Sequence, residues 1–203
     1  MTQVEAVLLA AGASSRMGRP KALLPWGGST LIESQTRSLD AAGISGIIVV
    51  LGHNASYIAS VVHETDRLKV LVNPDYNRGK TTSIKLGIKE VHARTEVVML
   101  LAVDQPRPVP LLKRLVYEHL KIRPLITQPK YRNQGGHPLL FDSSLLPELL
   151  EITEEQQGIR EVIRRHRDQI NQIAVGSPIV LLDLNTEEEY KRALQYPSIN
   201  TRL

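Results

Sequence analysis

Short apolar runs alternate with amphipathic stretches through the first half of the chain. The apolar runs, which are rich in Val, Ile and Leu, cover residues 4–10, 46–52, 68–73 and 96–104. Apolar positions at helical spacing occupy residues 29–43, 54–64 and 81–92. Nearly continuous apolar runs of this length are typical of strands that are covered on both faces. Strands that alternate with helices in this way predict a parallel sheet joined by right-handed crossovers.

The first of these helices has recognisable signals at both ends. Ser29 or Thr30 is a candidate N-cap, and Gly43 is a candidate stop. The positions that share one side of this helix are Ile32, Gln35, Leu39 and Ala42.

The regular alternation of predicted strands and helices ends after Asp104. Helical spacing recurs in residues 109–120, 143–151, 157–167 and 186–194. Short strands are predicted at residues 124–131, 136–141, 170–175 and 179–182. A polar turn at 132–135 separates the first two of these strands, which indicates an inserted hairpin or a mixed edge of the sheet. We therefore expect an α/β protein with a Rossmann-like, three-layer αβα architecture, a mostly parallel sheet and a small inserted β-hairpin or mixed edge.

Length and composition fit one globular domain over residues 1–203, with a loose tail over 197–203. Apolar residues make up 42% of the chain and charged residues 23%, which is ordinary for a soluble protein. The absence of cysteine excludes disulfides, zinc-thiolate sites and thiol nucleophiles. No apolar run approaches the roughly 20 residues that span a bilayer, so we expect no membrane segment and, by default, a cytoplasmic location.

The charge balance favours a small anionic ligand over a polyanion. The formal net charge is +4, and with one Trp and one Phe the chain offers few platforms for stacking bases, so we expect no nucleic-acid partner. The densest basic stretch, residues 160–168, carries apolar positions along one helical stripe. A solvated face is therefore the favoured interpretation of its arginines, with a phosphate or nucleic-acid contact as the alternative.

A glycine-punctuated loop with three cations, Arg16, Arg19 and Lys21, follows the first predicted strand. The loop does not match a dinucleotide fingerprint, because positions 12, 14 and 17 are Gly, Ser and Met. A Walker A loop is also excluded, because five residues separate Gly12 from Gly18 and Lys21 does not follow directly. What remains is either a turn with solvated cations or a loop that offers backbone N–H groups, hydroxyls and cations to an anion at the carboxyl end of a parallel strand.

Five segments in order carry a resemblance to a known family. They are "LLAAGASSRMGRPKALLPWGGSTLIE", "NPDYNRGKTTSIKLGI", "LLAVDQP", "GGHPLLF" and "LLDLNTEEEY". The set resembles the nucleotidyltransferases that activate molybdopterin, more closely the molybdenum cofactor cytidylyltransferase branch than the guanylyltransferase branch, and extends over nearly the whole chain. The resemblance implies the nucleotide-diphospho-sugar transferase type of fold, with residues 1–104 as the nucleotide-binding half and 105–196 as the acceptor-binding half.

The resemblance also implies a reaction and its partners. The terminal phosphate of molybdopterin or molybdenum cofactor would attack the α-phosphate of a nucleoside triphosphate, giving the dinucleotide cofactor and pyrophosphate with Mg²⁺ as cofactor. An acceptor molybdoenzyme or its chaperone is a further implied partner. Displacement at phosphorus is catalysed mainly by positioning and by neutralising charge, so a loop rich in cations is suitable equipment.

By the same resemblance, Leu9, Ala10, Ala11 and Gly12 would border the base and ribose of the nucleotide. Its β- and γ-phosphates would be wrapped by Ser14, Ser15, Arg16, Met17 and Gly18. Lys21 would lie against the α-phosphate, so Lys21, Arg16 and Asp104 are the predicted catalytic residues. Arg19 has no assigned ligand and is taken as solvated. Ala11 stands where the guanylyltransferases have glycine, which favours CTP over GTP.

A second segment is predicted to help in binding the base and ribose. Gly79 allows close backbone approach, and Thr82 and Ser83 at a helix start can donate hydrogen bonds.

Asp104 is the strongest candidate for a metal ligand, because it follows a buried strand directly and a carboxylate there can hold Mg²⁺ through one oxygen. Asp183 and Asn185 alternate along a predicted strand, so either would supply the second ligand. Asn185 replaces the aspartate that is usual in the cytidylyltransferases, and capping of the following helix is its alternative role. Val103 also departs from the family, which has glycine before this aspartate.

Acceptor binding is assigned by resemblance to Arg132, His137 and Arg160. Pro138 favours extended backbone at His137, and a packed or surface histidine is the alternative interpretation. Gln156 departs from the aspartate that usually precedes this helix start.

Two rival functions remain open from the sequence. One is transfer of a nucleotidyl group to another phosphorylated acceptor, such as a sugar or alditol phosphate. The other is a non-catalytic nucleotide-binding chaperone that delivers finished cofactor. The failed fingerprint disfavours an NAD-dependent oxidoreductase.

Overall fold

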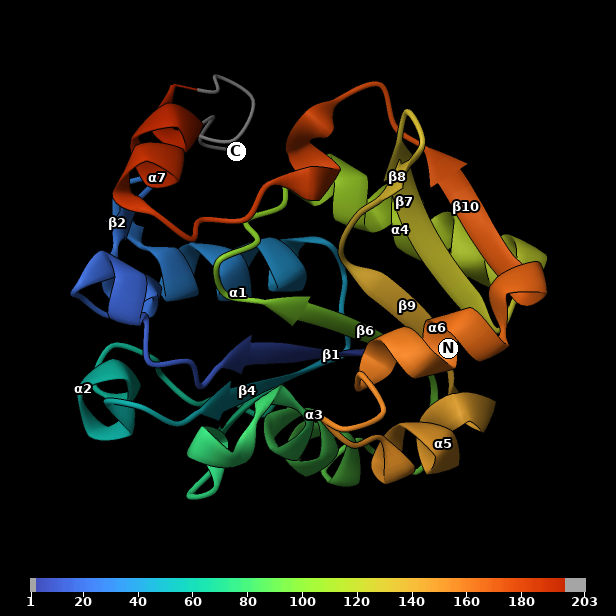
Figure 1. Cartoon of the computed structure of the whole chain (residues 1–203), viewed down its shortest axis with the longest axis horizontal. Coiled ribbons are helices and arrows are strands. Elements are labelled where there is room, and N and C mark those ends of the chain that lie inside the picture. The colour runs from blue at the N-terminus through green and yellow to red at the C-terminus, as the bar shows by residue number, and fades with distance from the viewer. Residues whose placement is uncertain (1–2, 196–203) are drawn as a thin grey trace.

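A single mixed sheet forms the middle layer of the protein, and helices cover both of its faces (Figure 1). The computed structural model describes residues 3–195. This arrangement is a Rossmann-like three-layer fold, as the alternation of strands and helices predicts.

The strands that the first half contributes to this sheet run parallel to one another. They are β1 (Gln3–Ala10), β4 (Gly46–Leu51), β5 (Leu68–Val72) and β6 (Thr95–Ala102). The second half contributes β7 (Ile126–Tyr131), β8 (Gln134–Gly135), β9 (Leu139–Asp142) and β10 (Ile170–Ala174). Along the sheet, the strands lie in the order β10, β7, β9, β6, β1, β4, β5. β9 lies antiparallel between β6 and β7, and β8 pairs antiparallel with β7. The expected hairpin and the expected mixed sheet are therefore both present.

Alternate residues of each central strand pack into two separate hydrophobic cores. On β1, Ala6 and Leu8 pack in the cluster that receives α1 (Leu31–Ala41) and α4 (Val109–Ile122). Val7 and Leu9 face the other cluster, which receives α3 (Lys80–Lys89), α5 (Leu146–Glu151) and α6 (Ile159–Arg165). Such alternation follows from the period of two along a strand, and it explains why the central strands are apolar at nearly every position.

Helix α7 (Glu187–Leu194) packs against the N-terminal part of the chain. Tyr190 packs in the same core as Trp26 and donates a hydrogen bond of 2.6 Å from its hydroxyl to the carbonyl of Pro25. Pro25–Trp26 (β2) pairs with Ser29–Thr30 (β3) in a small hairpin. Helix α7 therefore lies against the segment that follows β1 (Figure 1).

Helix caps agree with the sequence signals. Thr30 caps α1 and Thr186 caps α7, each through a capping box with Glu33 and Glu189 respectively. Because Thr186 supplies the cap of α7, the side chain of Asn185 is free of the capping role considered for it.

Three predicted elements need correction. Residues 179–182 are not a strand: Pro178–Leu181 form a short 3₁₀ helix, with Ser177 accepting a hydrogen bond at its start and Pro178 well placed in its first turn. The predicted helix 157–167 begins only at Ile159, because Gln157 and Gly158 have φ values of 64° and 58°. The helix expected over 54–64 is the short α2 (Ala55–Ala59), and the β-branched residues after it are poor helix formers.

None of the helices within residues 3–195 is long and apolar enough to cross a membrane. The tail predicted as loose over 197–203 lies outside the described residues.

Candidate active site

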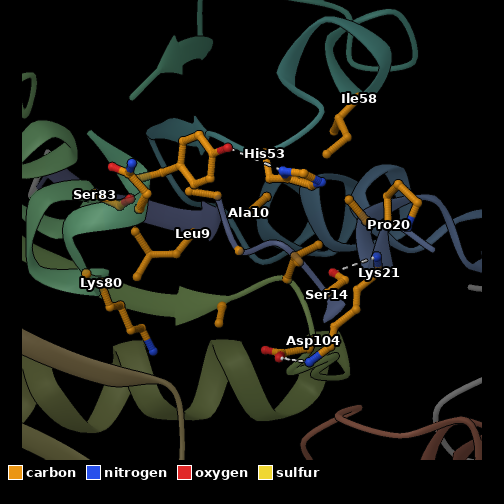
Figure 2. A pocket seen from close by; sticks show the side chains of 18 residues that line it. Leu9, Ala10, Ser14, Pro20, Lys21, His53, Ile58, Lys80, Ser83 and Asp104 are labelled. Atoms are coloured by element: carbon orange, nitrogen blue, oxygen red, sulfur yellow. Dashed lines mark hydrogen bonds and ion pairs between the residues drawn. The ribbon is translucent and has the colours of Figure 1, made fainter. Parts of the chain in front are cut away.

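A cavity of about 310 Å³ opens at the carboxyl ends of β1, β4 and β6, where parallel sheets place their ligand sites (Figure 2). Its wall combines residues from four segments that are distant in sequence. The lining residues are Leu9, Ala10, Ala11, Gly12, Ser14, Pro20, Lys21, Ala22, His53, Ile58, Tyr76, Asn77, Gly79, Lys80, Ser83, Ala102, Val103 and Asp104.

The loop after β1 is held in a tight turn by its own groups. Ser14 and Gly18 both have left-handed backbone, with φ values of 53° and 64°, and the amide of Met17 donates to the carbonyl of Ser14 at 2.9 Å. The Ser14 hydroxyl oxygen accepts a hydrogen bond of 3.2 Å from the amide of Lys21. This bond fixes the start of the segment that carries Lys21 into the cavity.

Lys21, Asp104 and Asn185 meet in one cluster at the edge of this cavity. The ammonium of Lys21 donates to Oδ2 of Asp104 at 2.7 Å and to Oδ1 of Asn185 at 2.9 Å. The side chains of Lys21 and Asp104 are only 12% and 21% exposed, so this ion pair is screened less by water than a surface pair. Arg16 adds a longer contact of 3.3 Å to the same oxygen of Asn185.

Hydrogen bonds from both sides of the strand end hold Asp104 in place. Gln35 is buried in α1, and its Nε2 donates to the carbonyls of Ala102 and Val103 at 3.1 and 3.0 Å. On the other side, the amide of Leu184 donates to the carbonyl of Asp104 at 2.9 Å. These bonds bring the 183–185 segment alongside the end of β6.

Asp183 and Asn185 do not share one strand face as expected, because residues 183–185 form no strand in the described part of the chain. Oδ1 of Asp183 accepts a hydrogen bond of 2.9 Å from Nε2 of Gln105, whereas Asn185 joins the cluster around Lys21. The structure therefore separates the two candidates for the second metal ligand. Of the two, only Asn185 contacts the ammonium of Lys21, which also contacts Asp104.

Arg19 is not simply solvated. Its guanidinium contacts both carboxylate oxygens of Glu187 at 3.1 and 3.0 Å and lies 5.6 Å from the ring centroid of Tyr190. Arg19 thus links the first loop to α7, while Arg16 and Lys21 turn toward Asn185 and Asp104.

The opposite end of the cavity is built from the loops after β4 and β5. Nδ1 of His53 lies 3.3 Å from the hydroxyl of Tyr76, and the two rings meet edge to face. Nδ2 of Asn73 donates to the hydroxyls of Thr82 and Ser83, both at 2.9 Å. Ser83 lines the cavity, whereas Thr82 turns its hydroxyl to the carbonyls of Asp75 and Gly79 and braces the loop.

A buried arginine that the sequence gave no reason to single out holds together segments of the second half of the chain. Arg107 is 2% exposed and donates to the backbone carbonyls of Pro106, His137, Val180 and Leu182. Burial lowers the pKa of Arg107 to about 10, and the charges of Asp183 and Asp104 oppose this effect. Arg107 therefore stays charged at neutral pH and ties the Gly136–Pro138 turn to the 180–182 segment.

The carbonyl of His137 accepts a hydrogen bond of 2.8 Å from Nε of Arg107, and a cis peptide bond joins His137 to Pro138. Burial lowers the pKa of His137 to about 4, with further lowering from the charges of Lys80 and Arg107. The imidazole is thus neutral at pH 7. The other two predicted acceptor residues, Arg132 and Arg160, are exposed, and Arg132 stacks on its neighbour Tyr131 with 5.3 Å between guanidinium carbon and ring centroid.

Comparison with models of protein families identifies the family of this chain. A family model described as the MobA-like NTP transferase domain matches residues 6–170. The chain belongs to this family. It is therefore an enzyme of the nucleotidyltransferase class, as the sequence resemblance implies.

Relatives of this MobA-like chain include proteins with different names. It is 30% identical to nicotine blue oxidoreductase of Paenarthrobacter nicotinovorans over 94% of this chain and 96% of that protein. It is 24% identical to molybdenum cofactor cytidylyltransferase of Escherichia coli K12 over 94% of this chain and 95% of that protein.

The crystal structure of Rv0371c from Mycobacterium tuberculosis H37Rv is similar, with a TM-score of 0.84, 28% identity, and coverage of 96% of this chain and 99% of that one. A structure of Rv0371c in complex with manganese has a TM-score of 0.77, with the same identity and coverage.

Within this MobA-like domain, the predicted nucleotide-binding residues fall into two groups. Those that line the cavity are Leu9, Ala10, Ala11, Gly12, Ser14, Lys21, Gly79 and Ser83. Those outside its lining are Ser15, Arg16, Met17, Gly18 and Thr82. The second group comprises the outer turn of the loop and the residue that braces the start of α3.

Sequence reasoning missed His53, Tyr76 and Lys80, which line the same cavity. A signal for them existed: each lies within a few residues of a β4 or β5 strand end or at the following helix start. Because adjacent parallel strands end at one edge of the sheet, the loops after β4 and β5 must neighbour the loop after β1.

Proposed function

We propose that the protein transfers a nucleotidyl group, CMP from CTP, to the phosphate of molybdopterin or molybdenum cofactor, releasing pyrophosphate. The observation that carries the proposal is the contact of Lys21 with both Asp104 and Asn185 at the edge of the cavity. This cluster combines the ammonium of Lys21 with two side-chain oxygens at the point where a triphosphate chain would leave the cavity. GTP is the alternative nucleotide, and a sugar or alditol phosphate is the alternative acceptor.

The residues present fit Mg²⁺ as a partner that arrives with substrate phosphates. Asp104 and Asn185 offer one carboxylate and one amide oxygen, both hard donors that already converge on a single cation. Within residues 3–195, no group of three or more His, Asp or Glu side chains forms a complete metal cage. Magnesium commonly uses one or two protein ligands and completes its shell with water and phosphate oxygens.

When bound, the metal supplies charge neutralisation at the phosphate oxygens. Asp104 and Asn185 would hold it. Lys21, released from Asp104, would place its ammonium on the α-phosphate, where negative charge develops during attack. Arg16, Ser14 and the backbone amides of the first loop would bind the β- and γ-phosphates that leave as pyrophosphate. In this step an oxygen of the acceptor phosphate bonds to the α-phosphorus while the bond between the α-phosphorus and the bridging oxygen breaks.

The choice of CTP rests on the part of the cavity wall next to β1, where side chains limit the space for the base. Ala10 and Ala11 are both buried and line the cavity, and a methyl group at position 11 takes space that a glycine would leave. A single-ring base fits such a wall more easily than a purine.

Further partners belong to the same proposal. The product is a finished cofactor, so an acceptor molybdoenzyme or its chaperone would receive it, and the proposed setting for this exchange is the cytoplasm.

The test is to incubate the protein with molybdenum cofactor, Mg²⁺ or Mn²⁺, and either CTP or GTP, and to follow pyrophosphate release. We expect release with CTP. Release with GTP alone would overturn the choice of base, and release only with a sugar or alditol phosphate would overturn the acceptor. Nucleotide binding without any pyrophosphate would support the cofactor-delivery chaperone instead.

A reduced-nicotinamide oxidation assay belongs in the same experiment, because a relative of nearly full coverage is named an oxidoreductase. Oxidation of NADH or NADPH dependent on the protein, with no pyrophosphate from any nucleotide, would refute nucleotidyl transfer.

A further inference from the structure

Arg19 belongs to the first loop, yet the contacts that the structure gives its side chain are with α7. Nη2 of Arg19 donates to Oε1 and Oε2 of Glu187, at 3.1 and 3.0 Å. The guanidinium carbon lies 5.6 Å from the ring centroid of Tyr190. Arg19 is also not among the residues that line the cavity. Its side chain therefore connects the loop to α7 instead of facing the proposed nucleotide.

Helix α7 contacts the chain on both sides of Lys21. Glu187, the first residue of the helix, binds Arg19, and the helix begins with a capping box. Tyr190 is 5% exposed, and its hydroxyl donates a hydrogen bond of 2.6 Å to the carbonyl of Pro25. Because the helix is capped and packed at this end, the carboxylate that Arg19 binds has a fixed position.

The link between Arg19 and Lys21 is short and stiff. Only Pro20 separates the two residues, and its ring fixes φ, here at −61°. Before Arg19, Gly18 has left-handed backbone with φ of 64°, and glycine adopts or leaves this conformation without strain. The direction of the chain after Gly18 is thus set by the contacts that follow it. The bound side chain of Arg19 therefore limits where Lys21 lies.

The Arg19–Glu187 pair contributes little to the stability of the whole protein. The two side chains are 47% and 38% exposed, so water screens their charges, and both must be ordered to make the contact. Catalytic groups, by contrast, must be held within about 0.5 Å of their productive geometry by the residues that support them. The effect of the pair is therefore expected in the placement of Lys21 and not in folding.

We propose that Arg19 is a positioning residue, whose pair with Glu187 holds the first loop against α7 and places the ammonium of Lys21 for the α-phosphate. This inference rests on the proposed function, because it names what holds the proposed phosphate ligand. The pair persists when nucleotide binds, whereas Lys21 exchanges Asp104 for phosphate. Glu187 lies beyond residues 6–170, so the pair joins the matched MobA-like domain to a segment that the family model does not cover.

A rival role for Arg19 is direct: it would leave Glu187 and bind the β- and γ-phosphates itself. In that role the carboxylate of Glu187 competes with the nucleotide for Arg19, so Glu187→Gln would raise the affinity for nucleotide. In the positioning role the same substitution lowers the affinity, as Arg19→Met does. The sign of the effect of Glu187→Gln decides between the two roles.

The experiment compares wild type, Arg19→Met and Glu187→Gln, with Glu188→Gln as the matched control. Glu188 is an exposed carboxylate in the same first turn of α7, so its substitution removes the same charge from the helix start without removing the partner of Arg19. Calorimetry measures the affinity for CTP with Mg²⁺. Hydrogen exchange of residues 12–24 without nucleotide reports how firmly the loop is held, and thermal unfolding checks the fold.

We expect Arg19→Met and Glu187→Gln each to weaken CTP binding by about threefold and to lower kcat by about fivefold, the upper end of what an exposed ion pair contributes. Exchange of the loop amides should become faster in both variants, with little change in Tm. Glu188→Gln should match the wild type. In a Lys21→Met background, Arg19→Met should lower the residual kcat no further, because Arg19 acts through Lys21.

Three results would overturn the positioning role: tighter CTP binding in Glu187→Gln, unchanged loop exchange in Arg19→Met, or additive losses of kcat from Arg19→Met and Lys21→Met. Absence of CTP binding by the wild type is a different failure, because it removes the proposed function. Loop exchange in Arg19→Met then still decides whether the pair holds the loop.

Discussion

The ammonium of Lys21 lies 2.7 Å from Oδ2 of Asp104, so a cation of the protein occupies the place that we propose for the metal. Oδ1 of Asn185 accepts a second hydrogen bond, of 2.9 Å, from the same ammonium. A divalent ion that arrived alone would have to displace this ammonium and leave it next to a second positive charge. A triphosphate offers Lys21 new anionic partners, so metal and nucleotide should bind together more readily than either binds alone.

Replacement of Lys21 by Met should therefore separate metal binding from nucleotide binding. Without nucleotide, Mn²⁺ should bind Lys21→Met about fivefold or more tightly than the wild type, because the competing cation has gone. Affinity for CTP should fall in the same variant. Electron paramagnetic resonance of free Mn²⁺ measures the first effect and calorimetry the second. Equal Mn²⁺ affinity in both proteins would show that Lys21 does not compete with the metal.

Asp104→Asn should remove most turnover, by about 100-fold or more, while the protein remains folded. The change keeps the size of the side chain but removes the charge that faces Lys21. Steady-state pyrophosphate release and circular dichroism together check this expectation. Asp66→Asn, at an exposed position outside the cavity lining, is the matched control. Wild-type rates in Asp104→Asn would refute the site.

Asn185→Asp should strengthen metal binding, since a second carboxylate would then contact the same cation position. We expect the Kd for Mn²⁺ in the presence of nucleotide to fall about threefold or more. Asp183→Asn should have a smaller effect, because Asp183 faces Gln105 rather than Lys21. A larger loss of metal affinity in Asp183→Asn than in Asn185→Ala would reverse this assignment of the second ligand.

Arg107→Met should destabilise the protein by about 3 kcal/mol or more, because carbonyls of Pro106, His137, Val180 and Leu182 would lose a charged donor in a buried place. Denaturant unfolding measures this loss. Arg94→Met, at an exposed position, should change stability by less than about 0.5 kcal/mol. A small effect of Arg107→Met would mean that the 180–182 segment is held by packing alone.

His119 should make the protein less stable in mild acid. It is fully buried, with Nδ1 2.9 Å from the hydroxyl of Thr127, and burial lowers its pKa to about 4. The unfolded chain, with a pKa near 6.5, takes up the proton first as the pH falls, so stability is lost between about pH 6.5 and 4. From pH 7 to pH 5 this histidine should account for about 2 kcal/mol of lost stability.

The matched measurement is denaturant unfolding of wild type and His119→Gln at both pH values. His119→Gln should show a correspondingly smaller difference between pH 7 and pH 5. An unchanged difference would mean that His119 does not carry this proton linkage.

Local patterns were enough to predict some parts of the site and not others. Asp104 could be identified because it directly follows a buried strand, and the loop containing Lys21 because it follows another. Gln35 was assigned only to one side of a helix together with apolar residues, although its amide braces the turn that presents Asp104. Arg107 gave no signal, because its partners are backbone carbonyls up to 75 residues away in sequence.

The sequence by itself determined the alternation of buried strands and amphipathic helices, and therefore the parallel sheet and the edge at which its loops gather. Hydrophobic periodicity is a local property, so it can be read along the chain. Only the tertiary structure decided that Asn185, rather than Asp183, meets Lys21 and Asp104. Those contacts join segments from opposite ends of the chain, and their geometry depends on how the second half packs against the first.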